Sequence, residues 1–147
     1  MATLRSEKEN NTARNEAELP VYLFHQGTNF RAYEYLGAHP IDGGFVFRVW
    51  APDAAAVAVT GDFDGWQGTL AMTRISEGGV WEAEGKGEGF HRGARYKYLI
   101  TAADGRRLYK ADPYAFAAEC PPDTASLMYG IPEHEWHDGG WMAARPD

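Results

Sequence analysis

The sequence predicts an all-β domain of the β-sandwich type, with a short helical segment before the strands. Hydrophobic residues make up 44% of the chain, which also contains 17 glycines and 8 prolines. This composition is typical of a globular protein with many turns. Short stretches of strand-like sequence follow one another after residue 41, separated by glycine-containing turns. Because 147 residues usually form one domain, a single sandwich with flanking segments is expected.

Two segments of different composition precede the strands. Residues 1–19 are polar and charged and have no periodic apolar face, so we expect a flexible tail. Residues 20–40 are too apolar to stay in solvent, and we expect them to pack on the sandwich as short helical turns. Their seven large apolar side chains are Tyr22, Leu23, Phe24, Phe30, Tyr33, Tyr35 and Leu36.

The strands themselves are expected within residues 41–130. In FVFRVW, after the IDGG turn, Phe45, Phe47 and Val49 alternate with residues of the opposite face, as in a half-buried strand. Trp50 and Trp81 lie inside strand patterns and are interpreted as sandwich residues. Further strands are expected in AAVAVTG, LAMTRI, VWEAEG and ARYKYLITA, with the turn signals EGG, GEGFHRG and ADG in the later part.

Charge and composition exclude several classes of function. The chain has 21 acidic and 14 basic residues, and its net charge of −7 opposes binding to nucleic acid. It has no apolar stretch that could span a bilayer and no secretory signal, so we expect a cytoplasmic protein without a membrane partner. Cys120 is the only cysteine, and the five histidines lack metal-ligand spacing. No metal or other cofactor is expected.

The stretch GDFDGW, residues 61–66, is the strongest candidate for a functional turn. Asp62 and Asp64 can each accept a hydrogen bond from the backbone N–H two residues further on. Phe63 can point inward as an anchor, and the turn then projects Trp66 outward. An exposed indole offers a flat apolar face on which a sugar ring can stack. The alternative is that Trp66 folds back over the sandwich edge as a lid on the core, because most tryptophans are highly buried.

Five stretches of the chain resemble, in order and spacing, the carbohydrate-binding module of family 48 near the N-terminus of glycogen branching enzymes. They are GGFVFRVWAPDAAAVAVTGDFDGW, GVWEAEG, RYKYLI, DGRRLYKADPYAF and PPDTASLMYG. The flanks LFHQGTNFRAYEYLGAHP and EWHDGGWMAARPD resemble the segments on either side of this module in bacterial branching enzymes. The resemblance implies an immunoglobulin-like sandwich joined to an α-amylase-type catalytic barrel. Residues 131–147 would be the linker toward that barrel, with Trp136 and Trp141 as anchors.

The resemblance also implies a carbohydrate site. In glycogen-binding members of the family, a platform tryptophan follows the turn and a lysine lies in an HxYKF-like strand; Trp66 and Lys97 match these positions. Lys97 stands between two tyrosines, so its ammonium should point away from their face and could donate to sugar hydroxyls. An ordinary solvated lysine is the alternative. Where relatives carry a second tryptophan after the next DG turn, this chain has Arg106 and Arg107.

Two classes of function follow from the resemblance. The first is a module that binds α-1,4-glucan chains for a branching enzyme, which cuts such chains and re-attaches the piece through an α-1,6 bond. The alternative is a structural domain that packs on the barrel, or the module of a glycogen-debranching or trehalose-releasing relative, with little sugar affinity. No catalytic residue is expected within these 147 residues. Asp62 and Asp64 stand two apart in one turn and are interpreted as turn formers rather than as a glycosidase pair.

Overall fold

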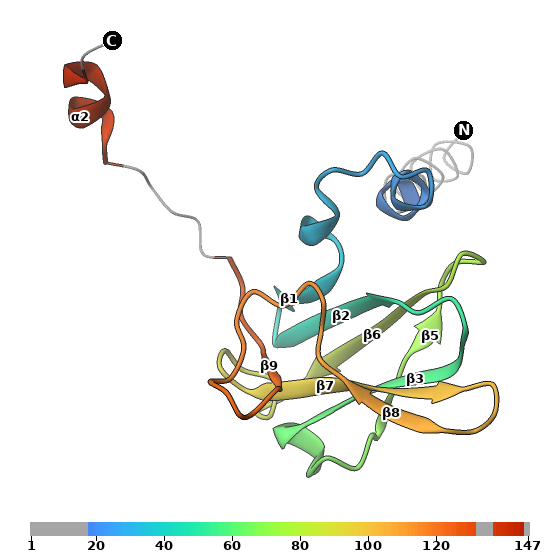
Figure 1. Cartoon of the computed structure of the whole chain (residues 1–147). Coiled ribbons are helices and arrows are strands. Elements are labelled where there is room, and N and C mark those ends of the chain that lie inside the picture. Colours follow the sequence, from blue (N-terminus) through green and yellow to red (C-terminus); the bar gives the residue numbers. More distant parts are fainter. Residues whose placement is uncertain (1–17, 132–136, 146–147) are drawn as a thin grey trace, which may run out of the picture.

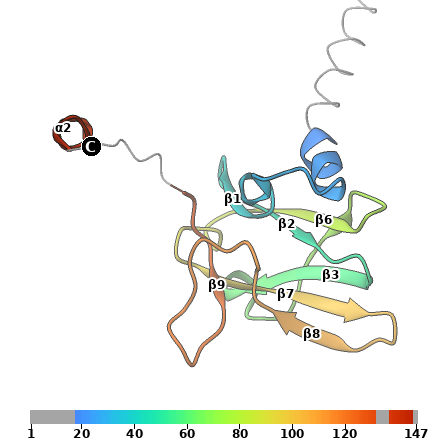
Figure 2. The ribbon, with the colours of Figure 1, turned by 45° about the horizontal axis from the view of Figure 1, so that its top comes forward.

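The computed structural model describes residues 18–131 and 137–145, so the expected tail up to residue 17 and Trp136 lie outside the described residues. Two antiparallel sheets stack face to face as a sandwich (Figures 1 and 2). Residues 18–25 are helical, so residues 18 and 19 belong to a helix rather than to a tail. A 3₁₀ turn, η1 (Ala32–Glu34), follows. The predicted β-sandwich with a short N-terminal helical segment is confirmed.

The first sheet has four strands in the order β1-β2-β6-β5. Their bounds are β1 Gly37–Ile41, β2 Gly44–Trp50, β5 Thr73–Arg74 and β6 Val80–Lys86. The sequence predicted β2 and β6, but β1 falls in the segment expected to form helical turns. It pairs with β2 across a two-residue turn, where Ile41 faces Gly44 and Gly43 has φ of 76°. An Asp-Gly pair favours this kind of tight hairpin.

The second sheet has five strands, in the order β4-β3-β7-β8 with β9 beside β7. Their bounds are β3 Ala54–Gly61, β4 Leu70–Ala71, β7 Arg95–Ala102, β8 Arg107–Lys110 and β9 Ser126–Leu127. The expected strand LAMTRI is divided between the sheets, since β4 pairs with β3 whereas β5 pairs with β6. Met72, between the two short strands, is buried in the core at the point where the chain changes sheet.

The core lies between the two sheets. Its largest cluster takes alternate residues from the long strands, among them Phe45, Phe47, Val49, Val57, Val59, Tyr96 and Tyr98. The expected inward face of residues 45–50 is therefore confirmed. Trp81 is buried as well and donates its indole N–H to the Ala51 carbonyl. Trp50 points the other way and is 52% exposed, with its ring edge against Phe24 at 5.7 Å between centroids.

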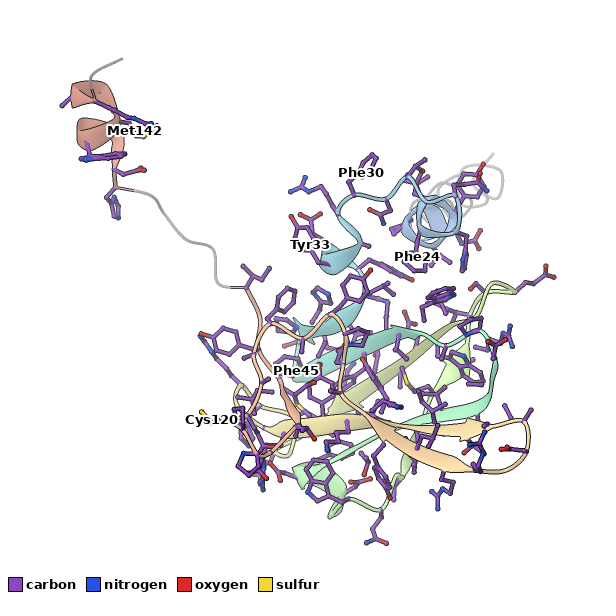
Figure 3. The ribbon with its side chains drawn as sticks, in the orientation of Figure 1. Phe24, Phe30, Tyr33, Phe45, Cys120 and Met142 are labelled. Atoms are coloured by element: carbon purple, nitrogen blue, oxygen red, sulfur yellow. The ribbon has the colours of Figure 1, made fainter. Side chains whose placement is uncertain are left out.

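The N-terminal segment covers the outer face of the four-stranded sheet. Leu36 is 1% exposed and packs with Ala32 and Val80, while Phe24 closes the edge of this cluster. Other large apolar side chains of the segment remain in solvent. Figure 3 shows Phe30 pointing away from the sheet, and it is 90% exposed. The expected packing on the sandwich therefore holds for only part of this segment.

At the other end of the described residues, a short helix, α2 (Gly139–Ala144), carries two exposed apolar side chains. Trp141 is 65% exposed and Met142 is 53% exposed. Within residues 18–131 and 137–145, no helix has both the length and the apolar character needed to cross a membrane.

Candidate functional site

The turn after β3 is organised by a single carboxylate. Asp64 accepts five hydrogen bonds, from the Thr60 hydroxyl, from the backbone N–H groups of Gly61, Trp66 and Thr69, and from the Thr69 hydroxyl. Burial alone would raise the pKa of Asp64, but the hydrogen bonds from Gly61, Thr69 and Thr60 outweigh it and lower the pKa. The expected bond from the N–H two residues on is confirmed for Asp64. This position needs an acceptor with two oxygens, because three of the donors reach Oδ1 and two reach Oδ2.

This turn holds Trp66 in an unusual backbone conformation. Gly65 and Trp66 both have positive φ, 60° and 65°, and Trp66 is the only non-glycine among the described residues with positive φ. Its N–H is held by the Gly61 carbonyl as well as by Asp64. Phe63 points inward as expected and stacks on Phe90 with 4.4 Å between ring centroids. The side chain of Trp66 is half-buried, so it is neither a buried lid nor a free indole.

Asp62 has a different role from the one expected. Its carboxylate accepts the backbone N–H of Arg95 and a forked pair of bonds from the Arg95 guanidinium, with Nη2 2.8 Å from Oδ1. These bonds from Arg95, together with a smaller one from the Trp66 side chain, lower the pKa of Asp62. Arg95 also contacts Glu119 at 3.3 Å, and Glu119 accepts the N–H of Ala125. One polar chain thus joins the turn, β7 and the loop before β9.

Lys97 lies beside this turn on the outer face of the five-stranded sheet. Tyr96 and Tyr98 face the core, so Lys97 points outward as predicted. It pairs with Thr60, whose hydroxyl is part of the Asp64 cluster. Its ammonium donates to the Thr124 hydroxyl over 2.7 Å. Lys97 is half-buried and hydrogen-bonded, so it is more ordered than the freely solvated lysine of the alternative interpretation.

Beneath the loop that carries Thr124 is a buried carboxylate, Asp112. It accepts the hydroxyls of Tyr96 and Tyr98 at 2.6 and 3.0 Å and the N–H of Tyr114, while its own N–H donates to Ser126. Burial raises the pKa of Asp112, although these hydrogen bonds act in the opposite direction. This network fixes the loop onto the sheet from below, because β9 begins at Ser126.

The outer face continues from the turn to β8. Leu99 lies under the turn, since a Cβ built on Gly68 would be 2.6 Å from its Cδ2 atom. Tyr109 is the partner of Leu99 across the β7-β8 ladder and is 51% exposed. Paired residues of an antiparallel ladder share a face, so Tyr109 stands on the same face as Lys97. Tyr109 could not be identified from its distance to the DG turn, which is followed directly by Arg106; only the pairing of the β7-β8 hairpin places it on this face.

The family described as carbohydrate-binding module 48, the isoamylase N-terminal domain, matches residues 35–115. This chain belongs to carbohydrate-binding module family 48. The immunoglobulin-like sandwich implied by the resemblance is therefore confirmed. The matched residues include the turn with Trp66, the strand with Lys97, and Tyr109.

The most similar relatives of this family 48 module include long bacterial proteins. The chain is 47% identical over 126 residues to a 1,4-alpha-glucan branching enzyme of Jannaschia sp., covering 86% of this chain and 18% of that protein. It is 48% identical over 125 residues to a 1,4-alpha-glucan branching enzyme of Butyrivibrio fibrisolvens, covering 82% and 19%. The chain thus spans about a fifth of the length of these relatives.

Among solved structures, the module is similar to part of a pullulanase from Klebsiella pneumoniae complexed with maltotriose. The TM-score is 0.50 at 29% identity, and the match covers 63% of this chain and 9% of the pullulanase.

The two carboxylates of the turn, Asp62 and Asp64, have lowered pKa values and are bonded to Arg95 and to the turn itself. A general acid needs a raised pKa, so neither carboxylate suits that role. Within the described residues, no cluster of His, Cys, Asp or Glu could hold a metal ion.

Proposed function

We propose that this module binds α-1,4-glucan chains on the outer face of the five-stranded sheet, at Trp66 and Lys97. The observation that carries the proposal is that the two residues stand on neighbouring elements joined by one polar network. Thr60, the ladder partner of Lys97, bonds to Asp64, which in turn holds the N–H of Trp66. A site fixed in advance loses little conformational entropy when the ligand binds.

The chemistry of this face suits a neutral sugar chain. A glucose ring has C–H groups on its faces and hydroxyls around its edge, so it can stack on the Trp66 indole while its hydroxyls meet polar groups. Lys97 and Thr124 supply an ammonium and a hydroxyl at the edge of the site. Tyr109, exposed on the same face, offers a second ring for the next glucose units.

The parent polypeptide, on this proposal, is a cytoplasmic 1,4-alpha-glucan branching enzyme, a glycosyltransferase of glycogen biosynthesis. The names of the relatives support it, and so does the fact that they are about five times longer than this chain. The catalytic barrel of the same polypeptide would then follow the module. A glucan held at Trp66 stays near that barrel and reaches its active site at a higher effective concentration.

A second candidate function is packing against that barrel. Its support is the apolar surface of the N-terminal segment, where Leu19 is 50%, Tyr22 60% and Phe30 90% exposed. Together with Leu23 and Tyr35, Leu19 and Phe30 line a shallow pocket. Exposed patches of this kind are typical of interfaces. This surface lies over the other sheet, so packing and glucan binding can coexist.

Substitution of Trp66 tests the binding proposal. Trp66→Ala should weaken binding of maltoheptaose about 10- to 100-fold in an NMR or calorimetric titration, because one stacking contact is removed. Denaturant melts of the same protein should show a loss of stability well below that of a core truncation. Trp141→Ala, which removes an exposed indole from α2, is the matched control and should bind like the parent.

The outcomes separate the two interpretations of Trp66. A core lid predicts a loss of about 3–5 kcal/mol in stability, with any binding defect following from unfolding. A Trp66→Ala protein that binds like the parent would also contradict the platform. Lys97→Ala should weaken binding less, about three- to tenfold for one hydrogen bond, whereas Lys86→Ala on the other sheet should have no effect.

A further inference from the structure

We infer that Arg107 is a further ligand-binding residue, whose guanidinium donates hydrogen bonds to hydroxyls of the glucan chain between the Trp66 turn and β8. This inference rests on the proposed function. It assigns a binding role to an arginine that follows the DG turn, where the resemblance to family 48 indicated only that a second tryptophan is missing. It changes the chemistry of this end of the site from stacking alone to stacking with directed polar contacts.

The position of Arg107 is fixed by β8 and by the turn. Arg107 pairs with Thr101, two residues beyond Leu99 on the outward row of β7. The guanidinium then reaches back over this face, since a Cβ built on Gly68 would lie 3.6 Å from its Nη2 atom. Gly68 follows Trp66 by two residues. The guanidinium of Arg107 therefore borders the same turn that carries the proposed platform.

Arg107 is the one arginine within the described residues whose guanidinium has no partner. Arg31, Arg48, Arg95 and Arg106 form ion pairs, Arg74 donates to backbone carbonyls, and Arg92 and Arg145 stand over aromatic rings. No hydrogen bond, ion pair or ring contact holds the guanidinium of Arg107 within residues 18–131 and 137–145, and its side chain is exposed. Its five N–H donors are free for a ligand.

A sugar chain is the ligand that these surroundings fit. Tyr109 stands on the same side of β8, two residues after Arg107, and is 51% exposed. A glucan that stacks on Trp66 and extends across the turn toward Tyr109 passes the guanidinium. The planar fork of arginine can donate to two neighbouring hydroxyls of one ring at once, which a lysine ammonium does with less directional control.

Arg107→Met tests the inference, because it keeps the aliphatic stem and removes every donor. Arg106→Met is the matched control, since the neighbouring guanidinium is already paired with Asp104 at 2.6 Å. In a maltoheptaose titration of the full chain, Arg107→Met should weaken binding about three- to tenfold and Arg106→Met less than twofold. Arg107→Lys should recover part of the loss. In the parent, the Nε–Hε signal of Arg107 should shift during the titration.

The results distinguish failure of the inference from failure of the proposed function. If Trp66→Ala weakens binding as expected while Arg107→Met binds like the parent, the inference is wrong and the proposed site stands. An equal effect of Arg106→Met and Arg107→Met would also overturn it, because the effect would then come from the loss of one positive charge and not from hydrogen bonds of Arg107. If the parent itself shows no binding to maltoheptaose, the proposed function fails first. Denaturant melts with the same midpoint as the parent confirm that both variants are folded.

Discussion

The outer faces of the two sheets are built on opposite principles. On the four-stranded sheet, the N-terminal segment covers the strands with apolar side chains, and Leu36 and Val80 are almost fully buried. On the five-stranded sheet, the cover is the turn after β3, and it is held by the carboxylates of Asp62 and Asp64. The first cover is fixed by burial of apolar area, and the second by directed hydrogen bonds.

One cover of this module contributes mainly stability, and the other mainly fixes geometry. Burial of apolar side chains contributes free energy without fixing orientation, whereas hydrogen bonds to charged acceptors fix atoms to within a narrow range of distance and angle. A binding site needs orientation more than it needs stability. Changes in the first cover should therefore lower stability and leave binding intact, while changes in the second should lower binding more than stability.

The largest expected effect is on the apolar cover. Leu36→Ala removes a side chain that is 1% exposed, and it should lower the free energy of unfolding by about 2–4 kcal/mol in denaturant melts. Maltoheptaose affinity of the folded fraction should stay that of the parent. Leu19→Ala, in the same segment but 50% exposed, is the control and should cost little. A loss of affinity in the folded Leu36→Ala protein would show that the apolar cover also supports the binding site.

The second effect is on the polar cover. Asp64→Ala removes the acceptor of five hydrogen bonds and should lower stability by about 1–3 kcal/mol. Binding should fall much further than stability, because Trp66 loses the bond that holds its positive φ. Asp42→Ala, at the exposed β1-β2 turn, is a matched loss of one carboxylate. Undiminished binding by Asp64→Ala would show that the turn is not what orients Trp66.

The same contrast explains how much of the fold the sequence could predict. Strands with long apolar alternation, such as β2 and β7, follow from the pattern alone because burial on one face fixes their period. β1 was missed because Pro40 and His39 interrupt its pattern, although the DG pair before Gly44 indicated a hairpin. β8 was missed because all four of its residues are exposed, so no apolar alternation marks it.

The candidate site was predictable only where the interacting residues are close to each other in the sequence. Turn residues such as Asp64 can be identified locally, because their partners are a few positions away. Asp62 could not be, because its partner Arg95 is 33 residues away in the sequence and becomes a neighbour only through the pairing of β3 with β7. Tyr109 is brought to this face by the β7-β8 hairpin, and Thr124 reaches Lys97 because the following residues pair with β7 as β9. Such contacts follow from register, which the sequence does not show directly.

A smaller effect is expected from acid. Bonds from Arg95 lower the pKa of Asp62, and for Asp64 burial is outweighed by backbone and hydroxyl donors, so its pKa is lowered too. A depressed folded-state pKa stabilises the fold above the unfolded pKa and loses that contribution as the pH falls. Melts should therefore show declining stability from about pH 5 to pH 3. Asp112 opposes this trend, because its raised pKa favours the folded state when it is protonated.

An Asp64→Asn variant isolates the turn in that titration. An amide cannot be protonated in this range, so the decline between about pH 5 and pH 3 should be shallower than in the parent. The variant keeps one oxygen for the N–H groups of Gly61 and Trp66 but presents an amide to the N–H of Thr69. A pH profile identical to that of the parent would assign the acid sensitivity to other carboxylates.

The smallest expected effect belongs to Phe30, which is part of the N-terminal segment but not of its buried cluster. Phe30 is 90% exposed, so Phe30→Ser should change the stability of this chain by no more than about 0.5 kcal/mol and leave glucan affinity unchanged. Phe24→Ser is the control, since Phe24 packs against Trp50 and the Leu36 cluster, and it should be clearly destabilising. In a polypeptide that includes the proposed barrel, Phe30→Ser should instead become destabilising, because an exposed aromatic side chain that is buried by a partner domain contributes only when that domain is present. If Phe30→Ser changes the stability of neither the 147-residue chain nor the longer polypeptide, the barrel does not dock on this apolar surface. The two outer faces would then differ in how they are covered but not in what they bind.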